Sequence, residues 1–100
     1  MGADIEELKQ KIAPVAVKYE LDKVILFGSR ARGDNRENSD YDFYINAPNM
    51  KSLLQLGCLF EDMKQALHSE VDIVLFPDKY TRVKEYLISA IKRDGVLVYG

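Results

Sequence analysis

Two short segments of the sequence have the pattern of β-strands, and each carries aspartate among apolar residues. In the first, apolar and polar side chains alternate along residues 40–45, which is the two-residue period of a strand, and Asp42 lies within it. In the second, Asp72 is the lone acid of the apolar run 71–76. Charged side chains rarely lie within apolar strands unless they are paired or bind a metal ion. These segments therefore predict a sheet that carries a carboxylate site, and a purely structural role for the acids is the less favoured interpretation.

The rest of the chain predicts the order α-β-β-α-β-α, with a short strand or tail at the end. One hundred residues, 47% of them apolar, are enough for one domain and too few for two, so we expect a single domain over residues 1–100. The fold class is α/β (α+β), a small mixed sheet with helices mainly on one face. The expected helices have apolar residues three or four positions apart, and the expected strands are short apolar runs: helices from Asp4 to about Val15, from Leu53 to Leu67 and from Tyr80 to Ile91, and strands at 24–27, 40–45, 71–76 and 96–99.

Several local expectations accompany this order. Asp4 and Glu7 form a capping box, and Pro14 should interrupt the first helix because proline lacks a backbone donor. Gly95 should end the last helix in the left-handed conformation. Cys58 is expected in the core of its helix, and His68 near a helix end.

Charge and composition exclude several classes of function. The net charge of −2 and a pI of about 5.4 argue against strong nucleic-acid binding, which needs a basic surface. A single cysteine excludes an internal disulfide and fits a reducing compartment. The N-terminus is acidic and does not resemble a signal peptide, and no apolar stretch approaches the roughly 20 residues that span a bilayer. We therefore expect a cytoplasmic protein without membrane contact.

Asp40, Asp42 and Asp72 have the chemistry of a divalent-metal site. Asp40 and Asp42 are two residues apart in a strand and should point to the same face. If the strand that carries Asp72 is a neighbour, the three carboxylates repel one another and raise each other's pKa, and a cation removes the repulsion. Ligation by oxygen alone suits Mg²⁺ or Mn²⁺ rather than zinc. Two ions would stabilise both the attacking and the leaving oxygen of an in-line displacement.

The segment after the first strand could bind phosphate. Gly28 allows a phosphate to approach the backbone, and the Ser29 hydroxyl with neighbouring amides can hold it. Arg30 and Arg32 could clamp phosphate oxygens. The alternatives are that Ser29 only caps a turn, and that one arginine only solvates the loop or pairs with an acid of the segment 34–37.

These features together resemble a known family. Gly28-Ser29 follows the apolar residues 24–27, and ten residues separate it from Asp-Tyr-Asp at 40–42. In these motifs the chain resembles the minimal nucleotidyltransferases (MNT) of the DNA polymerase β superfamily, the antitoxin type of HEPN–MNT toxin–antitoxin pairs. The third acid of that family lies on a later strand, where this chain has Asp72. The resemblance covers residues 24–96, and every signature position is kept.

The resemblance implies a role for each of these positions. Asp40 and Asp42 would coordinate two Mg²⁺ ions through the triphosphate of ATP or another nucleoside triphosphate. Asp72 would complete the ion that activates the acceptor hydroxyl. Gly28 and Ser29 would hold the β- and γ-phosphates, so that the α-phosphate is attacked and pyrophosphate leaves.

The resemblance also implies a partner. Family members of this size are commonly encoded with a HEPN-domain protein, and some transfer AMP from ATP to a tyrosine of that toxin. Two other hypotheses stay open, an antitoxin that neutralises its partner by contact without turnover, and a nucleotide sensor. Because so small a chain buries a limited share of its surface, we expect a homodimer or a hetero-oligomer.

Overall fold

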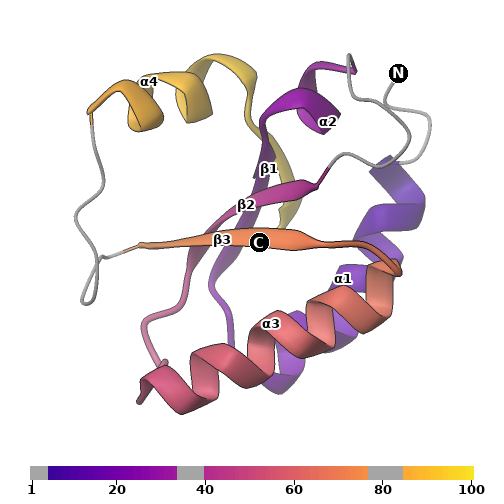
Figure 1. Ribbon diagram of the computed structural model, residues 1–100, viewed down its shortest axis with the longest axis vertical. Coiled ribbons are helices and arrows are strands. Elements are labelled where there is room, and N and C mark those ends of the chain that lie inside the picture. Colours follow the sequence, from indigo (N-terminus) through magenta and orange to yellow (C-terminus); the bar gives the residue numbers. More distant parts are fainter. Residues whose placement is uncertain (1–4, 34–39, 77–84) are drawn as a thin grey trace.

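The protein is a four-stranded sheet with helices on both sides (Figure 1). The computed structural model describes residues 5–33, 40–76 and 85–100. The capping box at Asp4 and the start of the last helix at Tyr80 lie outside these residues. In chain order the elements are α1 (Ile5–Lys18), β1 (Lys23–Phe27), α2 (Ser29–Arg32), β2 (Tyr41–Asn46), α3 (Leu53–Leu67), β3 (Val71–Phe76), α4 (Glu85–Asp94) and β4 (Val96–Tyr99).

The sheet is mixed, as the sequence predicted. Its strand order is β3-β2-β1-β4, with β1 antiparallel to both β2 and β4 and β2 parallel to β3. Parallel neighbours need a crossover connection, and α3 provides it between β2 and β3. The terminal residues form a strand, β4, at the edge beside β1. Because β1 runs against β2, the end of β1 lies beside the starts of β2 and β3.

Side chains alternate between the two faces of the sheet. On one face, buried residues of β1, β2 and β3 pack against α1 and α3, which lie together on that side (Figure 1). Helix α4 lies on the opposite side, where Ile91 is buried. The main core therefore occupies one face: Val24, Leu26, Phe43, Ile45, Val71 and Leu75 from the strands, and Leu8, Ile12, Ala16, Leu59, Met63 and Leu67 from the helices.

The sequence predicts that the apolar face of α3 consists of Leu53, Leu56, Phe60, Met63 and Leu67. The buried residues of the helix differ from this set. Leu59, Met63 and Leu67 are buried at spacings of four, whereas Leu53 is 62% exposed. Cys58 is also exposed, so its expected place in the helix core is wrong. A helix rotates by about 100° per residue, and Cys58 therefore points well away from the buried face that Leu59 defines.

Two expectations about helix interruption and termination need correction. Pro14 does not interrupt α1, which is continuous from Ile5 to Lys18. Buried side chains before and after the proline hold both halves of the helix against the sheet, which offsets the loss of one backbone donor. Gly95 does not adopt the left-handed conformation. It is needed for close packing instead, because a Cβ there would collide with the Ile91 carbonyl oxygen and come within 2.9 Å of Ile25 Cγ2.

The left-handed cap occurs at the end of α3, where His68 has φ 53° and donates its backbone N–H to the Lys64 carbonyl. The expected place of His68 near a helix end is confirmed. At the other end of this helix the Ser52 hydroxyl accepts from the Gln55 amide at 3.1 Å, a regular N-cap. No helix within the described residues is long and apolar enough to cross a membrane.

Candidate functional site

Asp42 and Asp72 are direct neighbours across the sheet. They are register partners in the parallel pair of β2 and β3, so their side chains lie on the same face, opposite to the main core. Asp42 is partly buried and Asp72 is exposed. Asp40 is exposed and precedes the first residue of β2. The two strands thus bring together at one end two carboxylates that are 30 residues apart in sequence.

The pKa of Asp42 is raised above its ordinary value. Burial is the largest cause, and the charges of Asp72 and then Asp40 add to it, while Arg32 acts in the opposite direction. The sequence predicted such mutual repulsion if the strands were neighbours, and for Asp42 this is confirmed. The surroundings of Asp42 therefore favour an added positive charge.

Gly28 lies against the Asp42 carboxylate. It follows β1 directly, after Phe27, which is the register partner of Asp42. Its backbone has φ 79° and ψ −158°, a conformation essentially restricted to glycine. A Cβ at this position would collide with the Asp42 Oδ2 atom. The absence of a side chain at residue 28 is therefore what allows the turn and the carboxylate to approach each other.

The segment after Gly28 forms one helical turn, α2. The Gly28 carbonyl accepts from the amides of Ala31 and Arg32, both at 3.1 Å. Gly33 ends the turn in the left-handed conformation, with its amide 2.9 Å from the Ser29 carbonyl. These bonds occupy the amides of Ala31, Arg32 and Gly33 and hold the turn closed. Residues 34–39 lie outside the described residues.

The two arginines of α2 have different environments. Arg30 lies over the Tyr41 ring, with its guanidinium carbon 4.1 Å from the ring centroid. Arg32 pairs with Asp94 at the end of α4, with 3.6 Å between Nη1 and Oδ2. The alternative partners at 34–37 lie outside the described residues. Of the two, Arg32 is the one whose charge acts on Asp42.

Asp94 and Tyr44 also belong to this region, and neither was expected to have a role here from the sequence. Hydrogen bonding to Arg93, and then the charges of Arg93 and Arg32, hold the pKa of Asp94 below its usual range. Tyr44 is two residues after Asp42 and shares its face, and burial raises the pKa of its hydroxyl. The alternation along β2 places Tyr44 on this face from the sequence alone, whereas no sequence pattern signals the contact between α2 and α4.

The carboxylates fit a metal ion that shares its ligands with a substrate. Within residues 5–33, 40–76 and 85–100, no group of three or more His, Cys, Asp and Glu side chains is arranged to hold a metal ion by itself. Mg²⁺, however, is usually bound by one or two carboxylates and takes its remaining ligands from phosphates and water. Asp42 and Asp72 provide such a pair, and the raised pKa of Asp42 is the electrostatic sign of a place that favours a cation.

Two carboxylates beside a glycine turn, at the end of a small mixed sheet, are typical of enzymes that transfer phosphoryl or nucleotidyl groups. Comparison with known proteins agrees. Residues 10–100 match the family described as polymerase beta, nucleotidyltransferase, and the chain belongs to this family. The resemblance seen in the sequence motifs and the expected enzyme class are thereby confirmed.

Relatives with similar sequences share nearly the full length of the chain. Two candidate protein adenylyltransferases of Methanocaldococcus jannaschii are 31% identical over 86 residues and 35% identical over 95 residues. The first match covers 86% of this chain and 92% of the relative, and the second covers 94% of each.

Solved structures share the fold. A toxin–antitoxin crystal structure with AMP-PNP has a TM-score of 0.75 at 24% identity, and the match covers 92% of this chain and 73% of the other. The complex of a tri-AMPylated Shewanella oneidensis HEPN toxin with its MNT antitoxin has a TM-score of 0.70 at 20% identity, covering 96% of this chain and 72% of the other. These likenesses confirm the expected polymerase β-like architecture.

Proposed function

We propose that this nucleotidyltransferase transfers AMP from ATP to a hydroxyl group of a protein, and that the acceptor is a tyrosine of a HEPN-domain partner that the transfer silences. The observation that carries the proposal is the side-by-side placement of Asp42 and Asp72, with Gly28 against the Asp42 carboxylate. The relatives named as candidate protein adenylyltransferases support a protein acceptor. The structural neighbours with AMP-PNP and with an AMPylated HEPN toxin support the nucleotide and the partner.

Binding of the nucleotide rests on the turn after β1. Gly28 lets the turn lie against the Asp42 carboxylate, and we assign the backbone and hydroxyl of Ser29 to the β- and γ-phosphates. Arg32 is near enough for its charge to act on Asp42, and it pairs with Asp94. We assign Arg32 to the phosphates as well, whereas Arg30 is turned toward Tyr41.

The carboxylates would hold the metal. Asp42 and Asp72 provide neighbouring oxygen ligands, and Asp40 adds a third carboxylate at the start of β2. When bound, Mg²⁺ supplies charge neutralisation on the triphosphate and on the attacking and leaving oxygens. The chain itself contributes orientation, because two neighbouring strands fix the carboxylates relative to each other and to Gly28.

The transfer exchanges one phosphorus–oxygen bond for another. The acceptor oxygen forms a bond to the α-phosphorus, and the bond between that phosphorus and the oxygen bridging to the β-phosphate breaks, which releases pyrophosphate. Asp72 is exposed, so an arriving hydroxyl can reach it, and we assign its carboxylate as the group that takes the hydroxyl proton. Asp42 and Asp72 are thus the second residues of β2 and β3, and they act on the metal and on the acceptor hydroxyl.

The test is the intact mass of the HEPN-domain protein encoded beside this one, measured after incubation with this chain, ATP and Mg²⁺. A gain of one or more AMP units with wild type, and none with Asp42→Ala, is the expected result. If no triphosphate gives a gain while both versions bind the partner tightly, the transferase proposal fails and an antitoxin that acts by contact remains.

A further inference from the structure

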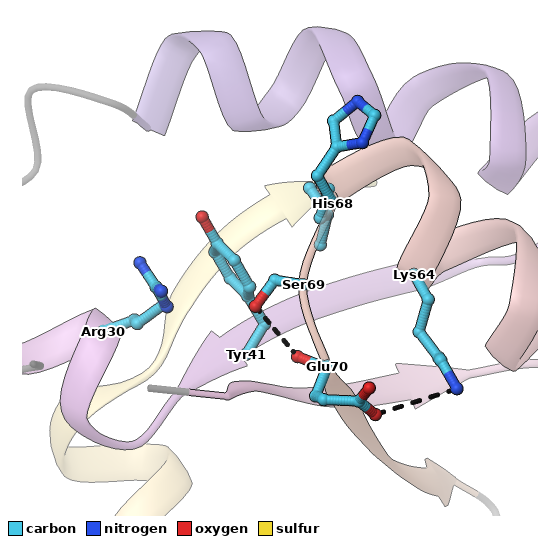
Figure 2. A pocket seen from close by; sticks show the side chains of 7 residues that line it. Arg30, Tyr41, Lys64, His68, Ser69 and Glu70 are labelled. Carbon is cyan, nitrogen blue, oxygen red and sulfur yellow. Dashed lines mark hydrogen bonds and ion pairs between the residues drawn. The ribbon is translucent and has the colours of Figure 1, made fainter. Parts of the chain in front are cut away.

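An open hollow lies near the carboxylate site, at the end of the sheet where β2 and β3 begin. It has a volume of about 510 Å³, and its lining includes Arg30, Tyr41, Lys64, His68, Ser69 and Glu70. Figure 2 shows the Tyr41 ring between Arg30 and the segment from His68 to Glu70, with Lys64 reaching Glu70 from α3. We name it the Tyr41 hollow. The roles proposed above for the carboxylates and for the turn at residues 28–33 do not involve this hollow.

The Tyr41 hollow and the carboxylates are built on the same two strand starts. Tyr41 lies between Asp40 and Asp42, but its side chain points to the opposite face from Asp42. Its amide donates to the Glu70 carbonyl at 3.0 Å, and Glu70 is two residues before Asp72. A protein that brings a hydroxyl to Asp42 and Asp72 therefore approaches the edge on which the hollow lies.

The cations of the hollow contrast with the charge of the chain as a whole. The net charge of the chain is −2, yet among the residues that the structure describes the lining holds the cations of Arg30 and Lys64 and the His68 ring against one carboxylate, Glu70. These cations would attract an acidic segment of a partner. The lining is largely polar, which suits a charged protein segment better than a small apolar ligand, whose pockets are mainly hydrophobic.

The cationic groups are positioned but not locked. Lys64 pairs with Glu61 at 3.5 Å and with Glu70 at 3.7 Å, and both acids are well exposed. Such exposed pairs contribute about 0–1 kcal/mol, so an incoming carboxylate can replace them. The Arg30 guanidinium lies over the Tyr41 ring, a contact that favours this position in the lining of the hollow.

We propose that the Tyr41 hollow binds an acidic segment of the protein acceptor, and that this contact presents the acceptor hydroxyl to Asp42 and Asp72. This inference rests on the proposed function for its acceptor, and its test measures binding of that acceptor without any transfer of AMP. It gives Arg30 a docking role in place of the phosphate clamp expected from the sequence. The recognised chemistry is one or more carboxylates of the acceptor, held by Lys64, His68 and Arg30.

The experiment is a titration of the neighbouring HEPN-domain protein with this chain, without nucleotide, in low and high salt. The double variant Lys64→Gln/His68→Asn removes two of the groups, and asparagine suits the left-handed backbone at residue 68. We expect binding about tenfold weaker than wild type in low salt and a much smaller difference near 1 M salt, where charges are screened. Lys51→Gln, an exposed lysine outside the hollow, is the matched control and should bind as wild type does.

One further variant and one further measurement keep the test decisive. Lys64→Arg preserves the charge and should bind as tightly as wild type, which separates loss of charge from loss of fold. With transfer measured, the double variant should raise the KM for the acceptor and leave the KM for ATP at its wild-type value. Binding of the double variant equal to that of Lys51→Gln, or absence of binding by wild type, would overturn the inference. Failure of the proposed function is a different result, namely tight and hollow-dependent binding with no transfer of AMP.

Discussion

On the face of the sheet covered by α1 and α3, strand β2 carries Phe43 and Ile45, both fully buried; on the opposite face the same strand carries Asp42 and Tyr44. Strand β3 repeats the division, with Val71 and Leu75 in the core and Asp72 on the other side. The alternation of a strand thus lets one segment stabilise the fold and build the site at once. Substitutions on the two faces should therefore separate stability from activity.

The largest expected effect is on activity, at Asp42. Asp42→Asn keeps the shape but removes the charge, and we expect transfer to fall by about 10³-fold, since metal-bound charge stabilisation contributes several kcal/mol. Rates of AMP incorporation at saturating ATP measure this effect. A loss smaller than about tenfold would remove Asp42 from the chemistry.

In Asp42→Asn the free energy of unfolding should rise although the rate of transfer falls. Burial and neighbouring carboxylates raise the pKa of Asp42, so its ionisation disfavours the folded state once the pH is above the folded pKa. Asp42→Asn removes that cost. Its thermal midpoint should equal or exceed that of wild type near neutral pH, and the difference should disappear below the ordinary aspartate pKa. A lower midpoint at neutral pH would show that the carboxylate stabilises the fold.

The next effect is on the core face. Leu59 is fully buried in α3 and does not line the hollow, and Leu59→Ala should cost about 3 kcal/mol of unfolding free energy through lost burial and a cavity. Urea unfolding gives the free energy. The rate per folded molecule should stay near wild type, and a selective loss of rate would break the separation between the faces.

Gly28 joins the two regions, and a substitution there should affect both. Gly28→Ala puts a Cβ against the Asp42 carboxylate in a backbone conformation that disfavours any side chain, at a cost of about 1–3 kcal/mol. Transfer should fall as well, since the carboxylate must move. Gly57→Ala is the matched control, because a Cβ there meets nothing within 4 Å and alanine favours the helix by about 1 kcal/mol. Calorimetry on both variants should give midpoint shifts of opposite sign.

The smallest effect concerns the contact between α1 and α3. Asp62 Oδ2 accepts from Lys18 Nζ at 2.8 Å and from the Tyr19 hydroxyl at 2.6 Å, and these bonds lower the pKa of Asp62, that from Lys18 most. A lowered pKa stabilises the fold above the ordinary aspartate value of about 3.9, and this contribution disappears as the pH falls through the lower folded value. Asp62→Asn should therefore cost about 1 kcal/mol at pH 7.

The pH dependence is the check on that contact. The difference in unfolding free energy between wild type and Asp62→Asn should shrink below pH 4. At neutral pH, Tyr19→Phe should lower the unfolding free energy by part of that difference. A difference that is constant down to pH 2 would show that the charge of Asp62 is not its cause.

Much of the sheet could be predicted from the sequence because alternation and apolar runs determine it directly. The strand at 71–76 was predicted with the bounds observed, and the parallel pairing then brings Asp42 and Asp72 together. The helix face was harder to predict. Leu53, Cys58 and Leu59 are all apolar enough to pack, and only the rotation of α3 against the sheet decides which of them is buried.

The environments of the arginines could not be predicted, for a related reason. Residues 30 and 32 lie in one helical turn, and their side chains diverge to contact Tyr41 and Asp94, which belong to elements far apart in the sequence. No local pattern encodes such contacts. The same holds for Gly95, where the requirement is space beside Ile25 rather than a left-handed backbone.

The most direct test of the paired carboxylates is binding of AMP-PNP with and without Mg²⁺, measured by calorimetry on wild type and on Asp42→Asn/Asp72→Asn. The pairing of Asp42 and Asp72 predicts that Mg²⁺ strengthens binding to wild type by at least about tenfold and has no effect on the double variant. Thermal unfolding checks that the double variant is folded. Equal dependence on Mg²⁺ in both proteins would contradict the assignment of the metal to Asp42 and Asp72.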